Sequence, residues 1–200
     1  RVLFRSYKVY LADYDILTEL TPTSRSCMFR VHYPQNEPAW FIVDAFDRGS
    51  KIVVDTLRRT VSGYSSRNSG GVPEGFRNYF VMTFNCDLQD CIVLDRGQVI
   101  DGQTSVEGEH AGCMVRLSLP STRELIVRVA SSFVSEAQAW RNLQENEGQN
   151  FDEMVENGRQ EWNKMLSKIE VDDPSLQAKQ TFYSCLYRCL LFPRSFFEIG

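Results

Sequence analysis

The sequence predicts a mostly β protein, an antiparallel β-sandwich followed by α-helices. From Tyr7 to about Val134, apolar residues recur mainly at every second position, which is the pattern of half-buried strands. About ten such short runs follow one another, with turn residues between them and no helical pattern, as in β-sandwiches. After Val134 the apolar spacing becomes helical, so we expect two different parts along the chain.

The strand runs are of two kinds. One kind alternates apolar and polar residues, as in Tyr7/Val9/Leu11, Cys27/Phe29/Val31/Tyr33 and Cys113/Val115/Leu117/Leu119. The other kind is apolar on both faces or nearly so, as in AWFIVDAF, KIVVDTL, NYFVMTF and ELIVRVA. Runs of this second kind predict strands that are covered on both sides.

Two capping-box patterns predict the first two helices. Ser135 with Gln138 opens an amphipathic segment that runs to about Asn146. Asn150 with Glu153 opens the segment FDEMVENGRQEWNKMLSKI, in which the apolar residues form one stripe. Because such caps satisfy backbone N–H groups in the first helical turn, we expect the helices to start there.

A third helix is predicted to begin at Asp172-Asp173-Pro174, where an acidic cap precedes a proline in the first turn. This segment and the final FPRSFFEIG are rich in large apolar residues. An exposed apolar surface of that size normally has a partner. The chain also starts at Arg1 without a methionine, so we expect it to be a piece of a longer polypeptide.

Composition and charge argue against three classes of partner or site. The net charge is -4 with basic and acidic residues interspersed, which gives no basic stripe for a nucleic acid. No apolar run approaches the roughly 20 residues that span a bilayer. The six cysteines and two histidines occur at no metal-ligand spacing. We therefore expect no nucleic-acid partner, no membrane span and no transition-metal site built from this chain alone.

No self-sufficient catalytic motif is present. His32 lies on the less apolar face of its strand and is interpreted as solvent-facing or hydrogen-bonded, while His110 falls in a predicted turn. Cys185 and Cys189 are four residues apart on one predicted helix, but without a second pair they are interpreted as small core residues. The chain also lacks a Walker loop, a G-x-S-x-G elbow and a calcium loop.

The stretch GYSSRNSGGVPEGFRNYFV, residues 63–81, has two interpretations. Its glycines and proline are ordinary turn residues, which favours a long hairpin loop between two strands. Its polar side chains, including Arg67, Asn68 and Glu74, and the backbone N–H groups exposed at its glycines leave a ligand-binding loop open.

Five segments, in this order and spacing, carry a family resemblance: YDILTELTPTSRSCMFRVHYP, SGYSSRNSGGVPEGFRNYFVMTF, FVSEAQAWRNLQENEG, FDEMVENGRQEWNKMLSKIEV and TFYSCLYRCLLFPRSF. Together they resemble glycoside hydrolase family 92, whose members are exo-acting α-mannosidases. The resemblance implies an N-terminal β-sandwich joined by helices to an (α/α)6 barrel. Residues 1–134 are then expected to be the later part of the sandwich, 135–173 the linking helices, and 174–200 the first helix of a truncated catalytic barrel.

The resemblance implies hydrolysis of terminal α-mannosides with inversion, dependent on calcium. In an inverting reaction one carboxylic acid protonates the leaving oxygen and a carboxylate activates water, with the two groups roughly 6.5 to 9.5 Å apart. Calcium is implied to bind sugar hydroxyls and to help distort the ring. The acid, the base and the calcium ligands are implied to lie in the later barrel, so no catalytic or metal-binding residue is assigned in this chain.

Five side chains are candidates for lining the substrate cleft. Arg194 and Glu198 follow the last predicted helix, which is expected to end on the barrel face where loops gather. The loop residues Arg67, Asn68 and Glu74 are the others. Arg194 departs from the residue found in many bacterial members, which leaves the linkage preference open.

The sequence leaves two functional hypotheses. The first is a fragment of an α-mannosidase acting on N-glycans or mannans, inactive alone, whose partners are a mannose-containing oligosaccharide and the rest of its own polypeptide. That substrate class points to a secreted or periplasmic location. The second is a non-catalytic carbohydrate-binding or structural sandwich. Carbohydrate-binding sandwiches usually expose an aromatic platform, whereas Trp40, Trp140 and Trp162 lie in apolar patterns that indicate burial.

Overall fold

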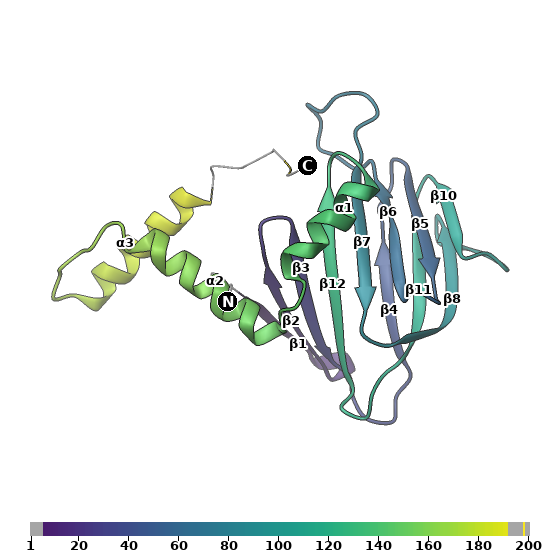
Figure 1. Ribbon diagram of the computed structural model, residues 1–200, viewed down its shortest axis with the longest axis horizontal. Helices are drawn as coiled ribbons and strands as arrows, with labels where there is room; N and C mark the ends of the chain where they lie inside the picture. Colours follow the sequence, from purple (N-terminus) through teal and green to yellow (C-terminus); the bar gives the residue numbers. More distant parts are fainter. Residues whose placement is uncertain (1–5, 192–197, 199–200) are drawn as a thin grey trace.

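The computed structural model describes residues 6–191 and 198, and its strands form two antiparallel sheets (Figure 1). The larger sheet contains, in spatial order, β1 (Tyr7–Leu11), β2 (Ile16–Pro22), β3 (Ser26–His32), β12 (Glu124–Ser132), β7 (Asn78–Phe84), β6 (Thr60–Ser65), β5 (Ser50–Asp55) and β10 (Ser105–Gly108). The smaller sheet contains β4 (Ala39–Asp44), β11 (Ala111–Ser118), β8 (Asp87–Asp95) and β9 (Gln98–Ile100). A 3-10 turn, η1 (Ala12–Tyr14), joins the first two strands. The predicted antiparallel sandwich is confirmed, with more strands than the sequence indicated.

One large apolar core lies between the two sheets. Val93 and Val115 from the smaller sheet and Val127 from the larger one are fully buried in it. The rings of Phe41 and Phe84 meet edge to face across the core, with centroids 5.4 Å apart. Burial of one such side chain stabilises the folded state by about 1.5–3 kcal/mol, so the sandwich has a substantial core of its own.

Two helices cover the outer face of the larger sheet (Figure 1). The first, α1 (Glu136–Leu143), packs Ala139 against Val81 of β7 and Ala130 of β12. The second, α2 (Phe151–Leu166), buries Phe151 and Met154 against Met28 of β3. This cover explains why NYFVMTF and ELIVRVA are apolar on both faces, because β7 and β12 have the core on one side and a helix on the other.

The helix starts follow the predicted caps in two cases. The Ser135 hydroxyl accepts a hydrogen bond from the Gln138 N–H at 3.1 Å, and α1 passes into a 3-10 turn, η2 (Gln144–Asn146). Asn150 and Glu153 make both bonds of a capping box at the start of α2. These two predictions are confirmed.

The third helix, α3 (Leu176–Leu190), begins later than predicted. Its cap is Ser175, whose hydroxyl accepts from the Ala178 N–H at 3.2 Å. The Asp173 carboxylate instead accepts from the Ser175 N–H at 2.7 Å, which closes a turn before the helix. The expected start at Asp172-Asp173-Pro174 is therefore wrong, because a hydroxyl directly before the helix satisfies the free N–H groups that the aspartate was expected to bind.

Beyond its first turns, α2 leaves the sandwich and forms with α3 a helical arm (Figure 1). The Trp162 ring of α2 contacts the Tyr187 ring of α3, with centroids 4.6 Å apart. No residue of α3 is buried. Among the described residues, no helix has the length and apolar character needed to cross a membrane.

Candidate functional site

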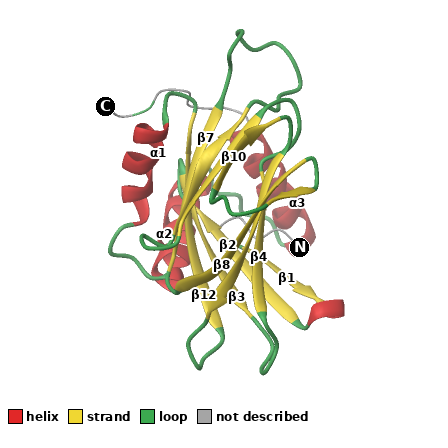
Figure 2. Cartoon of the chain, turned by 90° about the vertical axis from the view of Figure 1, so that its right-hand side faces the viewer, coloured by secondary structure: helices red, strands yellow, loops and turns green. Residues whose placement is uncertain are grey.

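The loop between β6 and β7 rises above the strand ends at one end of the sandwich (Figure 2). Its glycines Gly70, Gly71 and Gly75 have φ angles of 100°, 75° and 77°, which residues with a side chain rarely adopt. Apart from the neighbouring residues in the chain, no atom of residues 6–191 or 198 lies within 4 Å of the position of a Cβ at any of the three. Their role is therefore to let the backbone turn rather than to make room for a neighbouring group.

The loop is tied down on one side by the turn between β4 and β5. Arg67 forms an ion pair with Asp47, and Arg48 donates a hydrogen bond to the Asn68 carbonyl at 3.0 Å. The Asn68 side chain turns back into its own loop, where its Oδ1 accepts from the Gly70 N–H at 2.9 Å. Glu74 is exposed at the far side. Two of the three loop candidates are thus held in place, and the third is free to meet solvent or a ligand.

Phe133, which follows β12, joins the loop to the C-terminal segment. Its ring lies 5.5 Å from the Phe76 ring of the loop, measured between centroids. Its N–H donates to Glu198 Oε1 at 2.9 Å. The structure therefore brings Phe76 of the loop and Glu198 to the same end of the sandwich, although they are 122 positions apart in the sequence. Arg194 lies outside the described residues.

The Glu198 carboxylate faces the junction between β12 and α1. Its Oε2 accepts from the Ser132 hydroxyl at 2.6 Å and from the Asn142 amide at 3.0 Å. Partial burial raises the pKa of this carboxyl, but the hydrogen bonds from Ser132, Phe133 and Asn142 outweigh burial and leave the pKa below its usual value. Glu198 is thus held ionised and bound to the sandwich.

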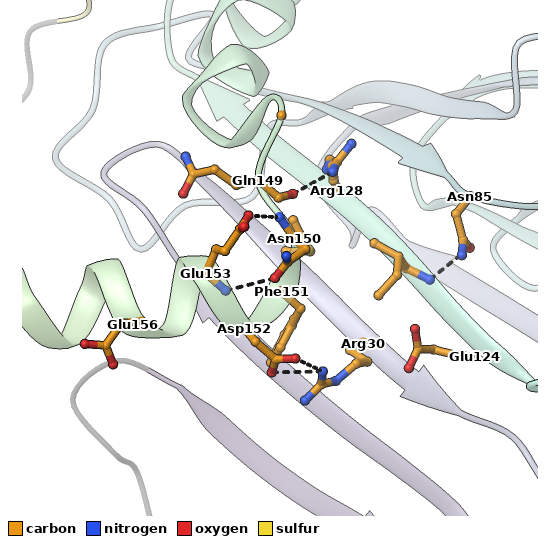
Figure 3. Close-up of a pocket in the computed structure, with 13 residues that line it drawn as sticks. Arg30, Asn85, Glu124, Arg128, Gln149, Asn150, Phe151, Asp152, Glu153 and Glu156 are labelled. Atoms are coloured by element: carbon orange, nitrogen blue, oxygen red, sulfur yellow. Dashed lines mark hydrogen bonds and ion pairs between the residues drawn. The ribbon is translucent and has the colours of Figure 1, made fainter.

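A polar groove of about 930 Å³ lies where α2 meets the larger sheet (Figure 3). Arg30 of β3 lines this groove and donates to Glu19 at 2.8 Å and to Asp152 at 3.0 Å. Its guanidinium also sits 4.2 Å from the centre of the Phe151 ring. Glu19 of β2 orients the arginine, and its contacts with Asp152 and Phe151 fix the first turn of α2 on the sheet.

A second charged contact holds the connection between α1 and α2. The Glu145 carboxylate accepts from the Thr23 hydroxyl at 2.6 Å, from the Arg25 N–H at 2.9 Å and from the Arg25 guanidinium at 3.1 Å. Neither Glu145 nor Arg30 is a candidate from the sequence, because the contacts between these helices and the sheet join residues about 120 positions apart. The only local signal was the capping box at Asn150, which places Asp152 in the first turn of α2.

Both histidines are paired with carboxylates. His32 Nε2 lies 3.7 Å from carboxylate oxygens of Glu19 and of Glu124, and it is partly exposed, in line with its interpretation. His110 Nε2 lies 2.7 Å from Asp44 Oδ1, in the turn before β11. Partial burial raises the pKa of Asp44, but hydrogen bonds from the Phe46 N–H and from His110 lower it more.

No three histidine, cysteine or acidic side chains come together as metal ligands among residues 6–191 and 198. The described part of this chain therefore holds no cluster of carboxylates for the implied calcium. The buried thiols are unsuited to metal binding as well, since burial raises the pKa of Cys113 to about 12 and that of Cys27 to about 11.

The expectation that three tryptophans are buried is wrong for Trp140. Its side chain on α1 is 37% exposed, whereas Trp40 and Trp162 are half-buried. Ala139 and Leu143 are on the face of α1 that packs against the sheet, and Trp140 lies outside that face. The apolar pattern of the sequence did not distinguish the two faces at this residue.

Two family models match consecutive parts of the chain. Residues 4–132 match the glycosyl hydrolase family 92 N-terminal domain, and residues 138–200 match the catalytic domain of the same family. The chain therefore comprises a family 92 N-terminal domain, which is the sandwich, and the start of a family 92 catalytic domain. It belongs to glycosyl hydrolase family 92, and the resemblance read from the sequence is confirmed.

Solved structures agree with this assignment. The family 92 inverting mannosidase BT2199 from Bacteroides thetaiotaomicron VPI-5482 is 32% identical with a TM-score of 0.95, over 100% of this chain and 27% of that one. The family 92 α-mannosidase BT3965 from Bacteroides thetaiotaomicron, in complex with mannoimidazole, is 27% identical with a TM-score of 0.85, over 97% of this chain and 27% of that one. The family 92 glycosyl hydrolase ccman5 shares the fold, with a TM-score of 0.82 at 24% identity over 92% of this chain and 25% of that one. No curated protein sequence matches. This chain thus spans about a quarter of the length of the solved relatives.

Proposed function

We propose that the complete polypeptide is an inverting, calcium-dependent α-mannosidase that hydrolyses terminal α-mannosides of N-glycans or mannans. The observation that supports this most is the similarity over the whole chain to an inverting family 92 mannosidase, at 32% identity and a TM-score of 0.95. The catalytic acid, the base and the calcium ligands belong in the remainder of the polypeptide. Calcium, when bound there, would coordinate sugar hydroxyls through oxygen ligands.

Within that enzyme, residues 1–134 would be the later part of the sandwich, 135–173 the linking helices and 174–200 the first barrel helix. The sandwich would act as a rigid base, and the ion pairs at Arg30 and Glu145 would set the direction in which the chain enters the barrel. The remaining barrel helices would cover the apolar surface of α3, which has no buried residue here. A secreted or periplasmic location would follow from the substrate class.

Hydrolysis of an aryl α-mannoside and of a mannose oligosaccharide by the full-length protein tests the proposal. We expect release of β-mannose as the first product, followed by NMR before mutarotation, and loss of turnover on calcium chelation with recovery on its return. Retained configuration, or full activity after chelation, would contradict the mechanism. The 200-residue chain alone is expected to show no turnover, and measurable turnover by it would place the catalytic groups within these residues.

The β6–β7 loop and Glu198 are proposed to line the substrate cleft near the domain boundary. The support is that both meet Phe133 at one end of the sandwich. In the full-length enzyme, Glu74→Ala removes an exposed carboxylate that has no hydrogen bond or ion pair with the described residues, so it should lower kcat/KM while leaving the unfolding midpoint unchanged. Arg67→Ala and Asn68→Ala should lower kcat/KM clearly while lowering the unfolding midpoint only slightly. Equal losses of activity and stability would make the loop a structural element only.

A further inference from the structure

The smaller sheet ends at β4, and one edge of this strand is free. β4 pairs with β11 on one side, and no described strand pairs with it on the other. The Ala45 N–H, directly after β4, donates to the Ala111 carbonyl at 3.0 Å. Residues of an antiparallel strand alternate between bonding to the partner strand and facing away from it. Trp40, Ile42 and Asp44 therefore direct their backbone N–H and C=O groups toward the free edge.

This edge lacks the protection that natural edge strands have. Among the described residues, one group bonds to its outward backbone, the Tyr33 hydroxyl, which donates to the Trp40 carbonyl at 3.0 Å. Residues 40–43 are WFIV, four apolar residues in a row without a lysine or a proline. The opposite edge strand of the same sheet, β9, is only three residues long, which is one way to protect an edge. The free edge of β4 is thus suited to pairing with another strand.

A groove of about 690 Å³ lies beside this edge. One wall is formed by η1 and the start of β2, and the other by β4 and the segment before it. Tyr14 on the first wall and Ile42 on the second are 70% and 64% exposed. An extended segment in this groove would reach the outward backbone groups of β4 and cover both side chains.

The inner face of β1 is also uncovered on this side of the sandwich. Val9 pairs with Thr18, and Thr18 pairs with Val31, which is buried in the core between the sheets. Alternation places Tyr7 and Leu11 on the same face as Val9, yet they are 39% and 42% exposed. In Figure 1, β1 and β2 lie to the left of β4, the last strand of the smaller sheet. A strand added to β4 would extend the smaller sheet toward this face.

The rest of the polypeptide is the best source of that strand. This chain spans only 27% of the length of the family 92 mannosidases BT2199 and BT3965. Most of a protein of that length is therefore available to fill the groove. A strand of the same polypeptide is present at a high effective concentration, whereas a strand of a second copy must be recruited from solution.

We propose that the groove between η1 and β4 binds one β-strand from the rest of the polypeptide. This strand pairs with the free edge of β4, becomes the fifth strand of the smaller sheet and covers Tyr7 and Leu11. The proposal rests on family membership and on the open edge, and it does not depend on mannoside hydrolysis. An active mannosidase with an empty groove would therefore contradict this inference alone.

Photo-cross-linking of the full-length protein tests which segment fills the groove. Tyr14→p-benzoylphenylalanine and Ile42→p-benzoylphenylalanine place a reactive group on each wall. Both should cross-link within one molecule to the same peptide outside these 200 residues, identified by mass spectrometry. The matched control is Val99→p-benzoylphenylalanine, 54% exposed on β9 at the other edge of the sheet, which should not reach that peptide. Links between two molecules, links only within residues 1–200, or no link at either wall would overturn the proposal.

Amide hydrogen exchange in the full-length protein tests the strand pairing and needs no variant. The Val43 N–H faces β11 whether or not a strand is added, so it is the internal control. Bonded to an added strand, the Ile42 amide should exchange within about tenfold of the Val43 rate. At a free edge it should exchange roughly a thousandfold faster or more. Fast exchange at Ile42 would overturn the pairing even if a segment cross-links in the groove.

Discussion

The sandwich and the helical arm differ in how they bury apolar side chains. The sandwich encloses fully buried residues such as Val93 and Leu125 between two sheets and covers its outer face with α1 and the start of α2. The arm holds many apolar residues on α3, yet none of them is buried, and Leu176 is 70% exposed. Apolar burial is the main stabilising term in folding, so the sandwich is stable through its own contacts. The arm leaves the apolar side chains of α3 uncovered, and a surface of that kind normally packs against a partner.

The largest expected effect contrasts one leucine from each region. Leu125→Ala, in the core, should lower the free energy of unfolding of the 200-residue chain by about 3–4 kcal/mol, because it leaves a cavity. Leu176→Ala should cost less than about 0.5 kcal/mol in the same chain. Urea unfolding followed by circular dichroism measures both. In the full-length protein the cost of Leu176→Ala should rise to about 2 kcal/mol if other helices cover α3, and an unchanged cost would argue against that cover.

A second substitution tests how tightly the sandwich is packed. A Cβ on Gly63 of β6 would lie 1.9 Å from the Lys51 carbonyl oxygen of β5, so the two backbones would have to separate. Gly63→Ala should therefore destabilise the full-length protein by about 3 kcal/mol. Gly112→Ala is the matched control, because its nearest contact is an ordinary 3.5 Å to the Val43 carbonyl. Equal shifts in the thermal midpoints of the two variants would contradict the close approach.

A third substitution weakens the connection between the two regions. Glu145→Gln keeps the size of the side chain but removes the charge that accepts hydrogen bonds from Thr23 and Arg25, and should cost about 1.5 kcal/mol. Amide hydrogen exchange should accelerate between α1 and α2 more than in β12. The control is Glu147→Gln, two residues away and exposed. Uniform acceleration over the whole chain would show that Glu145 supports overall stability instead of this connection.

The smallest effect is a pH dependence at Glu19. Burial raises the pKa of this carboxyl, but hydrogen bonds and charges from Arg30 and Lys8 lower it more, so its pKa lies below the usual value of a glutamate carboxyl. A lowered pKa in the folded state stabilises the protein above the unfolded pKa, and the stabilisation is lost as pH falls through the folded pKa. Between pH 6 and pH 3, wild type should therefore lose more stability than Glu19→Gln. Parallel curves of urea midpoint against pH would rule out this contribution. Glu161→Gln, on the exposed side of α2, should follow wild type.

Local sequence patterns were sufficient to predict several features of the fold, because each of these features depends on residues that are close together in the chain. Alternation in β11 reports a half-buried strand, and double-sided apolar runs in β7 and β12 report cover on both faces. The same two-sided prediction is wrong for AWFIVDAF, because Ile42 of β4 is 64% exposed, and α2 covers the second face of β3 at Met28 although its sequence alternates. The capping box at Asn150 is made within four residues, so it was predicted correctly. The start of α3 was misplaced by a few residues, because Asp173 and Ser175 are both good caps and only the backbone path chooses between them.

The sequence by itself determined the sandwich, the change to helices near Val134 and membership of glycosyl hydrolase family 92, since these are encoded in periodicity and in contiguous strings of residues. Only the tertiary structure decided the strand order, the ion pairs of Arg30 and Glu145, and the meeting of Glu198 with the β6–β7 loop at Phe133. Those features join residues up to 122 positions apart. Their partners are chosen by how the sheets and helices pack, which no local pattern specifies.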